Sequence, residues 1–403
     1  MSDKENDPVN EQQRLAEEYN TWKSTAPYLY DVLLTKTLIW PSLTCQWLPR
    51  ITRENGFARQ ELMVGSHTND EEPNYLQFFN VDTPVKNDEQ NNKARLYATQ
   101  QIYHEGEVNA ARYQPSNSEI LATKTRDGDV LVFDRTKTAS STDTTCHPML
   151  RLKGHTTEGY GLAWNPHPSK SNHLLSAGYD HIICHWDIGM STPDKDNTLQ
   201  PYQQYKGHDA CVEDVSWSAG DDSVFASVAD DMKLMIWDTR TPSRPVQQVQ
   251  AHDGEVNSVA FNPKQEWLIA TGSSDKTIGL FDLRKLQTKL HSLEMHEGQV
   301  SQVEWNPHEP SVLASAADDR KIIIWDLSRI GQEQTPEDAE DGPPELMFMH
   351  SGHTSKISQF DWNPTEPWMI ASTAEDNVVQ VWQMSRKIYA EGDKLTLTAN
   401  DLE

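Results

Sequence analysis

The chain has 403 residues and a formal net charge of −26, from 61 acidic and 35 basic side chains. This charge argues against a DNA or RNA groove, which would bind phosphates through Lys and Arg, and favours basic partners attracted from a distance. No apolar run reaches the roughly 20 residues of a membrane span, so we expect no membrane contact.

The cysteines are widely separated and form no CxxC pair; they are Cys45, Cys146, Cys184 and Cys211. We therefore expect reduced thiols in the cytosol or nucleus. The acidic N-terminus does not have the features of a signal peptide.

Residues 1–9 are polar and are predicted to be a disordered tail. Residues 10–37 are predicted to be a helix and a lead-in segment, in which Asn10 caps the helix and Pro27 ends it. The apolar stripe of this helix consists of Leu15, Tyr19 and Trp22. Because an isolated helix of about 15 residues is marginal in water, we expect it to dock on the side of the fold and to take part in binding.

Residues 38–384 contain a repeat. The first segment, 38–49, lacks the histidine that opens the six later units. Those histidines are His104, His155, His208, His252, His296 and His353. Nine positions later stand Tyr113, Trp164, Trp217, Phe261, Trp305 and Trp362. The turn aspartates of the units are Asp127, Asp180, Asp231, Asp275, Asp319 and Asp376.

This period of 44 to 57 residues is typical of four-stranded propeller blades. The short apolar runs between the marker residues are rich in Val, Ile and aromatic residues, as in β-strands. A single blade cannot bury both faces, so neighbouring blades must stack. We predict an all-β fold, a seven-bladed WD-repeat β-propeller with an N-terminal helix and a short C-terminal helix.

The repeated His, Asp, Ser/Thr and Trp side chains can satisfy one another's hydrogen bonds inside each blade. Histidines spread around a ring cannot converge on one metal ion. The sequence has no GxSxG, HExxH, Walker A or GxGxxG motif. We therefore expect no enzyme activity, no catalytic residues, no metal and no cofactor.

An acidic insertion occupies residues 331–345. Its acids are Glu333, Glu337, Asp338, Glu340, Asp341 and Glu345, and it contains no Lys or Arg. The apolar residues Leu346, Phe348 and Met349 follow it. Together with Tyr28 and Leu29, they could form an apolar groove with an acidic lip for a basic amphipathic helix; the alternative is a disordered loop. Residues 385–403 are predicted to be a short helix and a tail.

A second candidate site lies where the innermost strands begin. The residues three positions after each histidine are Glu107, Glu158, Cys211, Glu255, Gln299 and Lys356. Those five positions after it are Asn109, Tyr160, Glu213, Asn257, Ser301 and Ser358. Strand alternation predicts that both sets point to one side, near the central channel. This face is either a pocket for a basic peptide or a solvated rim.

The sequence resembles the retinoblastoma-binding histone chaperones, a family of WD-repeat proteins. The resemblance rests on stretches such as EEYNTWKSTAPYLYD, WPSLTCQWLP, SVADDMKLMIWDTR and EQTPEDAEDGPPELMFMHSGHT. It covers nearly everything from about residue 15 to 385. The family implies a non-catalytic histone-binding subunit of the nucleus and cytoplasm, found in type B histone acetyltransferase, chromatin assembly, deacetylase and Polycomb complexes.

The resemblance also implies two sites. A side groove would bind the first helix of the type-four core histone through Tyr28, Leu29, Asp338, Glu340, Asp341, Leu346, Phe348 and Met349. A top-face site would bind the tail of the type-three histone and similar basic motifs through Glu107, Asn109, Glu158, Tyr160, Glu213, Asn257 and Glu375. In the second site, Tyr160 would form one wall of a slot for an inserted arginine.

The chain departs from the family at Ser301, where a second aromatic wall is expected, and at Gln299, where an acid is expected. Losing a cation–π face costs about 0.5–2 kcal/mol. We therefore expect a weakened or altered top-face site beside an intact side groove. This favours the type B acetyltransferase complex, whose catalytic subunit would be a partner. A different hypothesis is a substrate receptor of a cullin ubiquitin ligase, because IWDTR (236–240) and LFDLR (280–284) resemble the motif of such receptors.

Overall fold

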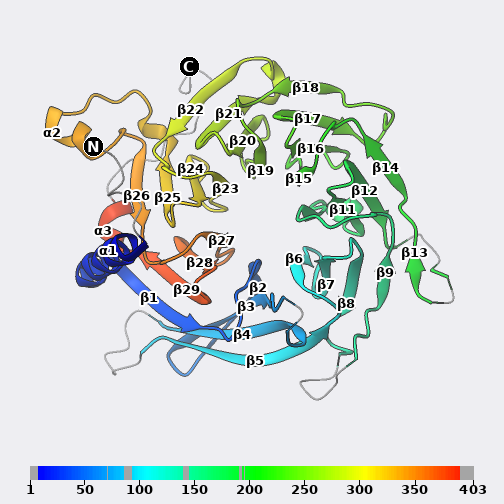
Figure 1. Cartoon of the computed structure of the whole chain (residues 1–403), viewed down its shortest axis with the longest axis horizontal. Coiled ribbons are helices and arrows are strands. Elements are labelled where there is room, and N and C mark those ends of the chain that lie inside the picture. The colour runs from blue at the N-terminus through cyan, green and yellow to red at the C-terminus, as the bar shows by residue number, and fades with distance from the viewer. Residues whose placement is uncertain are drawn as a thin grey trace.

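The computed structural model describes residues 8–69, 71–85, 93–138, 145–189, 193–194 and 196–390. Within these ranges the strands form seven sheets around a central axis, so the predicted seven-bladed propeller is confirmed (Figure 1). The tails predicted before residue 8 and after residue 390, and the side chain of Asn10, lie outside the described part.

The first four blades follow one another along the chain. Blade one contains β2 (Cys45–Glu54), β3 (Phe57–Gly65), β4 (Asn74–Pro84) and β5 (Arg95–His104). Blade two contains β6 (Val108–Gln114), β7 (Asn117–Thr125), β8 (Val130–Asp134), β9 (Leu150–Leu152) and the added β13 (Thr198–Leu199). Blade three contains β10 (Leu162–Trp164), β11 (His173–Ala177), β12 (Ile182–Asp187) and β14 (Gln203–Lys206). Blade four contains β15 (Val212–Trp217), β16 (Val224–Ala229), β17 (Lys233–Asp238) and β18 (Gln247–Gln250).

The last three blades complete the ring. Blade five contains β19 (Val256–Phe261), β20 (Leu268–Ser273), β21 (Thr277–Asp282) and β22 (Lys289–Glu294). Blade six contains β23 (Val300–Trp305), β24 (Val312–Ala317), β25 (Ile322–Asp326) and β26 (Leu346–His350). Blade seven contains β27 (Ile357–Trp362), β28 (Met369–Ala374), β29 (Val378–Met384) and β1 (Tyr30–Thr37). Short 3-10 turns are η1 (Pro168–Lys170), η2 (Leu283–Lys285) and η3 (Leu327–Arg329).

Blade seven closes the ring by joining the two ends of the chain. Strand β1 pairs antiparallel with β29, and Leu33 lies opposite Trp382. The helix before it, α1, spans Pro8–Leu29, so the prediction that Pro27 ends the helix is wrong. Proline removes one N–H donor, which would have bonded the carbonyl of Lys23. Lys23 is exposed, so water can bond that carbonyl, while buried Ala26 and Tyr30 anchor the last turn.

The predicted side-chain network is present in the regular blades. In blade four, His208 Nδ1 lies 3.0 Å from the Asp231 carboxylate and Nε2 lies 2.7 Å from Ser227 Oγ. Trp237 Nε1 donates to the same hydroxyl at 2.8 Å. Blade two differs from this prediction: its histidine, His104, faces the Gly106 carbonyl oxygen at 2.8 Å, and Asp127 is exposed.

These buried histidines make the fold sensitive to acid. Burial lowers the pKa of His104 to about 4. The unfolded chain therefore takes up a proton near pH 6.5, before the folded protein does, and the free energy of unfolding falls as the pH decreases through this window. At pH 5 we expect this one group to cost about 2 kcal/mol. The difference between urea unfolding at pH 7 and pH 5 should shrink by that amount in His104→Gln. In the control, the exposed His181→Gln, the difference should not change.

Candidate binding sites

Helix α1 is docked on the side of the propeller at the seam between blades six and seven (Figure 1). Trp22 Nε1 donates to Tyr30 Oη at 3.0 Å, and Tyr30 Oη lies 2.8 Å from His350 Nδ1. The His350 ring stacks on Trp382 with centroids 4.3 Å apart. The predicted docking of the helix is therefore confirmed, and aromatic contacts provide it.

The acidic insertion contains a short helix, α2 (Pro336–Glu340), instead of a structureless loop. Thr335 caps it: its hydroxyl accepts from the Asp338 N–H at 3.1 Å and donates to the Asp338 carboxylate at 2.7 Å. The predicted lip acids Asp338, Glu340 and Asp341 are all exposed. Glu345 is different, because it is buried and lies 3.3 Å from His291 Nε2. The acidic lip is therefore formed by α2 and its flanks, without Glu345.

The apolar residues predicted for the groove occupy different depths. Tyr28 is 83% exposed, and Leu29 is partly buried against the core of blade seven. Leu346 and Met349 are partly buried against the neighbouring core between blades five and six. Phe348 is buried, with its ring 5.4 Å from that of Tyr30, so it supports the groove from below and does not line its surface.

Alternation along β26 explains this difference, because it buries Phe348 and His350 and leaves Met347 and Met349 partly exposed. The structure adds three residues that we did not predict for this surface. Met347, Ile388 and Tyr389 pack beside Leu29 on the same core. The helix α3 (Arg386–Tyr389) supplies two of them, and its apolar Ile-Tyr pair was the available signal.

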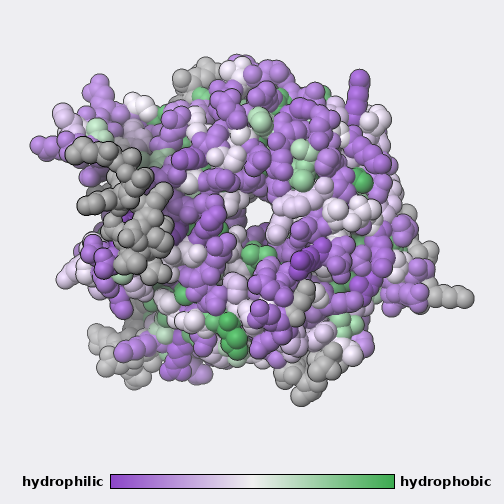
Figure 2. All heavy atoms as spheres, in the orientation of Figure 1, coloured by the Kyte–Doolittle hydropathy of each residue, from purple (hydrophilic) through white to green (hydrophobic). Residues whose placement is uncertain are grey.

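The second candidate site is a cavity of about 420 Å³ at the axis of the ring, where Figure 2 shows a central opening. All six residues five positions after the repeat histidines line it: Asn109, Tyr160, Glu213, Asn257, Ser301 and Ser358. Of the residues at the third position, Gln299 lines it. The prediction that both sets point the same way is therefore wrong. The strands begin at the fourth position and the pairing shifts just after it, as between Val256 and Ser258, so alternation does not extend across this point.

Three predicted acids of this site are bonded within the protein. Glu107 is buried, accepts the Asn69 N–H at 2.8 Å and lies 3.1 Å from His67 Nε2, so it pins a loop of blade one. Glu158 accepts from Asn109 at 3.4 Å. Glu375 accepts from Ser355 at 3.4 Å. Glu213 is therefore the predicted acid that lines the cavity itself.

Buried charge dominates the cavity wall. Burial, followed by repulsion from Asp230, raises the pKa of Glu213 to about 8. Tyr179 Oη donates to Glu213 at 3.3 Å, which opposes this rise. We did not predict Tyr179 as a site residue. It stands directly before the turn aspartate Asp180, and the equivalent position of the last repeat is Glu375, so the repeat spacing contained a signal.

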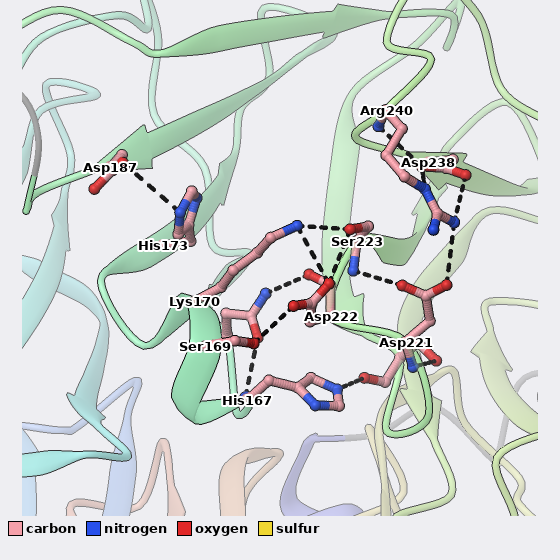
Figure 3. A network of polar contacts seen from close by, with 12 residues as sticks. His167, Ser169, Lys170, His173, Asp187, Asp221, Asp222, Ser223, Asp238 and Arg240 are labelled. Carbon is pink, nitrogen blue, oxygen red and sulfur yellow. Dashed lines mark hydrogen bonds and ion pairs between the residues drawn. The ribbon is translucent and has the colours of Figure 1, made fainter.

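Polar contacts between blades three and four account for one residue of the cullin-ligase motif (Figure 3). Arg240 Nε donates to Asp238 at 2.8 Å, and its Nη2 donates to Asp221 at 3.1 Å. In the same network Lys170 Nζ donates to Ser223 at 2.6 Å. Arg240 therefore has a structural role in joining neighbouring loops, which explains it without a ligase.

Comparison with known families gives two matches. A family model for the histone-binding protein RBBP4, which also covers the corresponding protein of the CAF1 complex, matches residues 17–85. A model of the WD domain, G-beta repeat, matches 146–187, 199–238, 243–282, 287–326 and 344–383. The chain belongs to the RBBP4-type family of WD-repeat proteins. In this RBBP4-type chain, the first match contains most of α1, the closing strand β1 and three strands of blade one.

The described residues of this RBBP4-type protein contain no group of three or more His, Cys, Asp or Glu side chains arranged to hold a metal ion. The repeat histidines are bonded within their own blades, as His296 is to Asp319 at 2.8 Å. None of the described helices is long and apolar enough to span a bilayer. The two surfaces described above are therefore the features to which a function can be assigned.

Proposed function

We propose that this protein is a non-catalytic histone chaperone that holds the first helix of the type-four core histone. The binding site is the side groove between α1 and the acidic helix α2. The observation that carries this proposal is the position of Leu29 and Met347 on one apolar core, below a lip with three exposed acids. An amphipathic helix with basic residues on its polar face complements both features.

The charge of the chain supports this proposal. A formal net charge of −26 attracts a basic histone and accelerates its encounter with the protein. The family match at residues 17–85 includes α1 up to its last residue, Leu29, and so includes one wall of the groove. The binding would be weaker at high salt, because exposed charges are screened over about 8 Å at physiological ionic strength.

A titration with a peptide of this histone helix tests the proposal. The matched control is the same peptide with its basic residues replaced by glutamate. We expect submicromolar binding of the first peptide and at least a hundredfold weaker binding of the second. Equal affinity for both peptides would contradict an acidic lip.

We further propose that the protein is the histone-binding subunit of the type B histone acetyltransferase complex, acting on newly made histone in the cytoplasm and nucleus. The departure at Ser301 supports this assignment, because it alters the top face and leaves the side groove as the main histone site. Mass spectrometry of co-purifying proteins tests it. The acetyltransferase catalytic subunit should be the most abundant partner, while an excess of chromatin assembly, deacetylase or Polycomb subunits would assign the protein to those complexes.

A further inference from the structure

The axial cavity contains an aromatic corner beside a buried carboxylate, which the side-groove function does not use. The rings of Tyr160 and Tyr179 have centroids 5.8 Å apart and are tilted by 52°. Tyr179 donates its hydroxyl proton to Glu213 Oε2 at 3.3 Å. Both tyrosines and Glu213 line the cavity, and Tyr160 is 38% exposed. An apolar ring pair and an acceptor therefore meet at one point of the wall.

The surroundings of Glu213 favour a positive ligand. Asp230, Asp214 and Glu255 all repel a negative charge on Glu213. Arg112 also lines the cavity, but its guanidinium donates to the Ala111 carbonyl at 2.8 Å and to Gln359 at 3.2 Å. A cation that enters the cavity would relieve the repulsion among these acids.

Two hydroxyl groups on the cavity wall differ in their contacts. Ser301 donates to the Ala316 carbonyl at 3.2 Å, so its hydroxyl points to its own blade. The Ser358 hydroxyl is buried and has no hydrogen-bond partner among the described residues. A buried unpaired hydroxyl is costly, and a donor on a ligand would satisfy it.

The ring geometry decides which cation fits. A planar group between two rings needs about 7 Å, because each aromatic contact takes about 3.5 Å. The two tyrosine rings are closer than this, so a guanidinium cannot enter between them. It could stack on one ring only, whereas a compact ammonium can contact both rings and donate to a carboxylate.

We propose that the axial cavity binds the ammonium group of a lysine side chain from a peptide, in preference to arginine, and that Tyr179 is a binding residue. Tyr160 and Tyr179 supply the aromatic faces, and Glu213 accepts a hydrogen bond from the ammonium. This site is separate from the side groove, so the two can fail independently.

Titrations of the full chain with three peptides test this proposal, followed by NMR or calorimetry. The peptides have identical neutral flanks and differ only in the central residue, which is lysine, arginine or norleucine. We expect the lysine peptide to bind about fivefold tighter than the arginine peptide and about tenfold tighter than the norleucine peptide. Equal or tighter binding of the arginine peptide would overturn the proposal.

Variants locate the effect. Tyr179→Ala should weaken lysine binding about fivefold and remove the preference over arginine, while Tyr179→Phe should keep the preference because the ring remains. The control is Tyr202→Ala, which removes a 65% exposed ring that does not line the cavity. Affinity for the histone helix, measured on each preparation, shows whether a variant is folded. Unchanged lysine binding in a folded Tyr179→Ala variant would also overturn the proposal.

Discussion

Replacing Asp338 and Asp341 together by arginine should reduce the affinity for the histone helix at least a hundredfold. Both carboxylates are exposed on or beside α2, where a basic helix would approach. Removing charge pairs that a partner desolvates costs about 2–5 kcal/mol, and the introduced cations also repel the histone. Calorimetry with the histone-helix peptide measures the effect.

Two further variants separate local contact from overall charge. Asp209→Arg with Asp253→Arg changes the net charge equally on blades four and five, and should weaken binding only about twofold. Asp338→Asn with Asp341→Asn keeps the polar atom that bonds Thr335, so α2 should keep its cap while binding falls about tenfold. An equal loss in the remote pair would mean that net charge, and not the groove, attracts the histone.

Replacing Trp22 by alanine should release α1 from the propeller. The indole packs on the blade-seven core and donates to Tyr30, and Gly352 leaves room for it: a Cβ there would come within 2.7 Å of the Trp22 ring. We expect a loss of about 2–3 kcal/mol, below the range for fully buried Trp because this side chain is only partly buried. Hydrogen exchange of residues 13–29 and urea unfolding measure it.

Releasing α1 should also weaken histone binding about tenfold or more, because Leu29 would leave the groove wall. Trp22→Phe keeps the ring packing and loses the hydrogen bond, for which about 1 kcal/mol is expected. The control is Trp40→Ala, whose indole donates to Glu72 on blade one. Unchanged exchange of α1 in Trp22→Ala would show that other contacts hold the helix.

The architecture was predictable because it repeats. Six copies of one spacing determine six blades, and the same spacing identifies the His208–Asp231 pair before its 3.0 Å contact is known. Contacts between distant segments were less accessible. The pairing of β1 with β29 joins residues more than three hundred positions apart, and no local pattern in residues 30–37 indicates it.

The errors have local physical causes. Pro27 lies in a helix that tertiary packing extends, which propensity alone does not capture. Glu107 was assigned to the axial site by alternation, but the shift of pairing at the start of β6 breaks the alternation. Phe348 was assigned to the groove surface, and the ring contacts with Tyr30 and Trp382 place it below. In each case the residue type was noticed and its direction was not.

The most direct test of the acidic groove is to replace residues 332–342 with a short Gly-Ser linker and to measure binding of the histone helix. This deletion removes α2 with Asp338 and Asp341, and keeps Glu345, whose carbonyl accepts the Asp326 N–H at 2.8 Å. We predict that the propeller keeps its melting temperature within a few degrees and that affinity falls more than a hundredfold. Capture of the histone at full strength by the deleted protein would contradict the account.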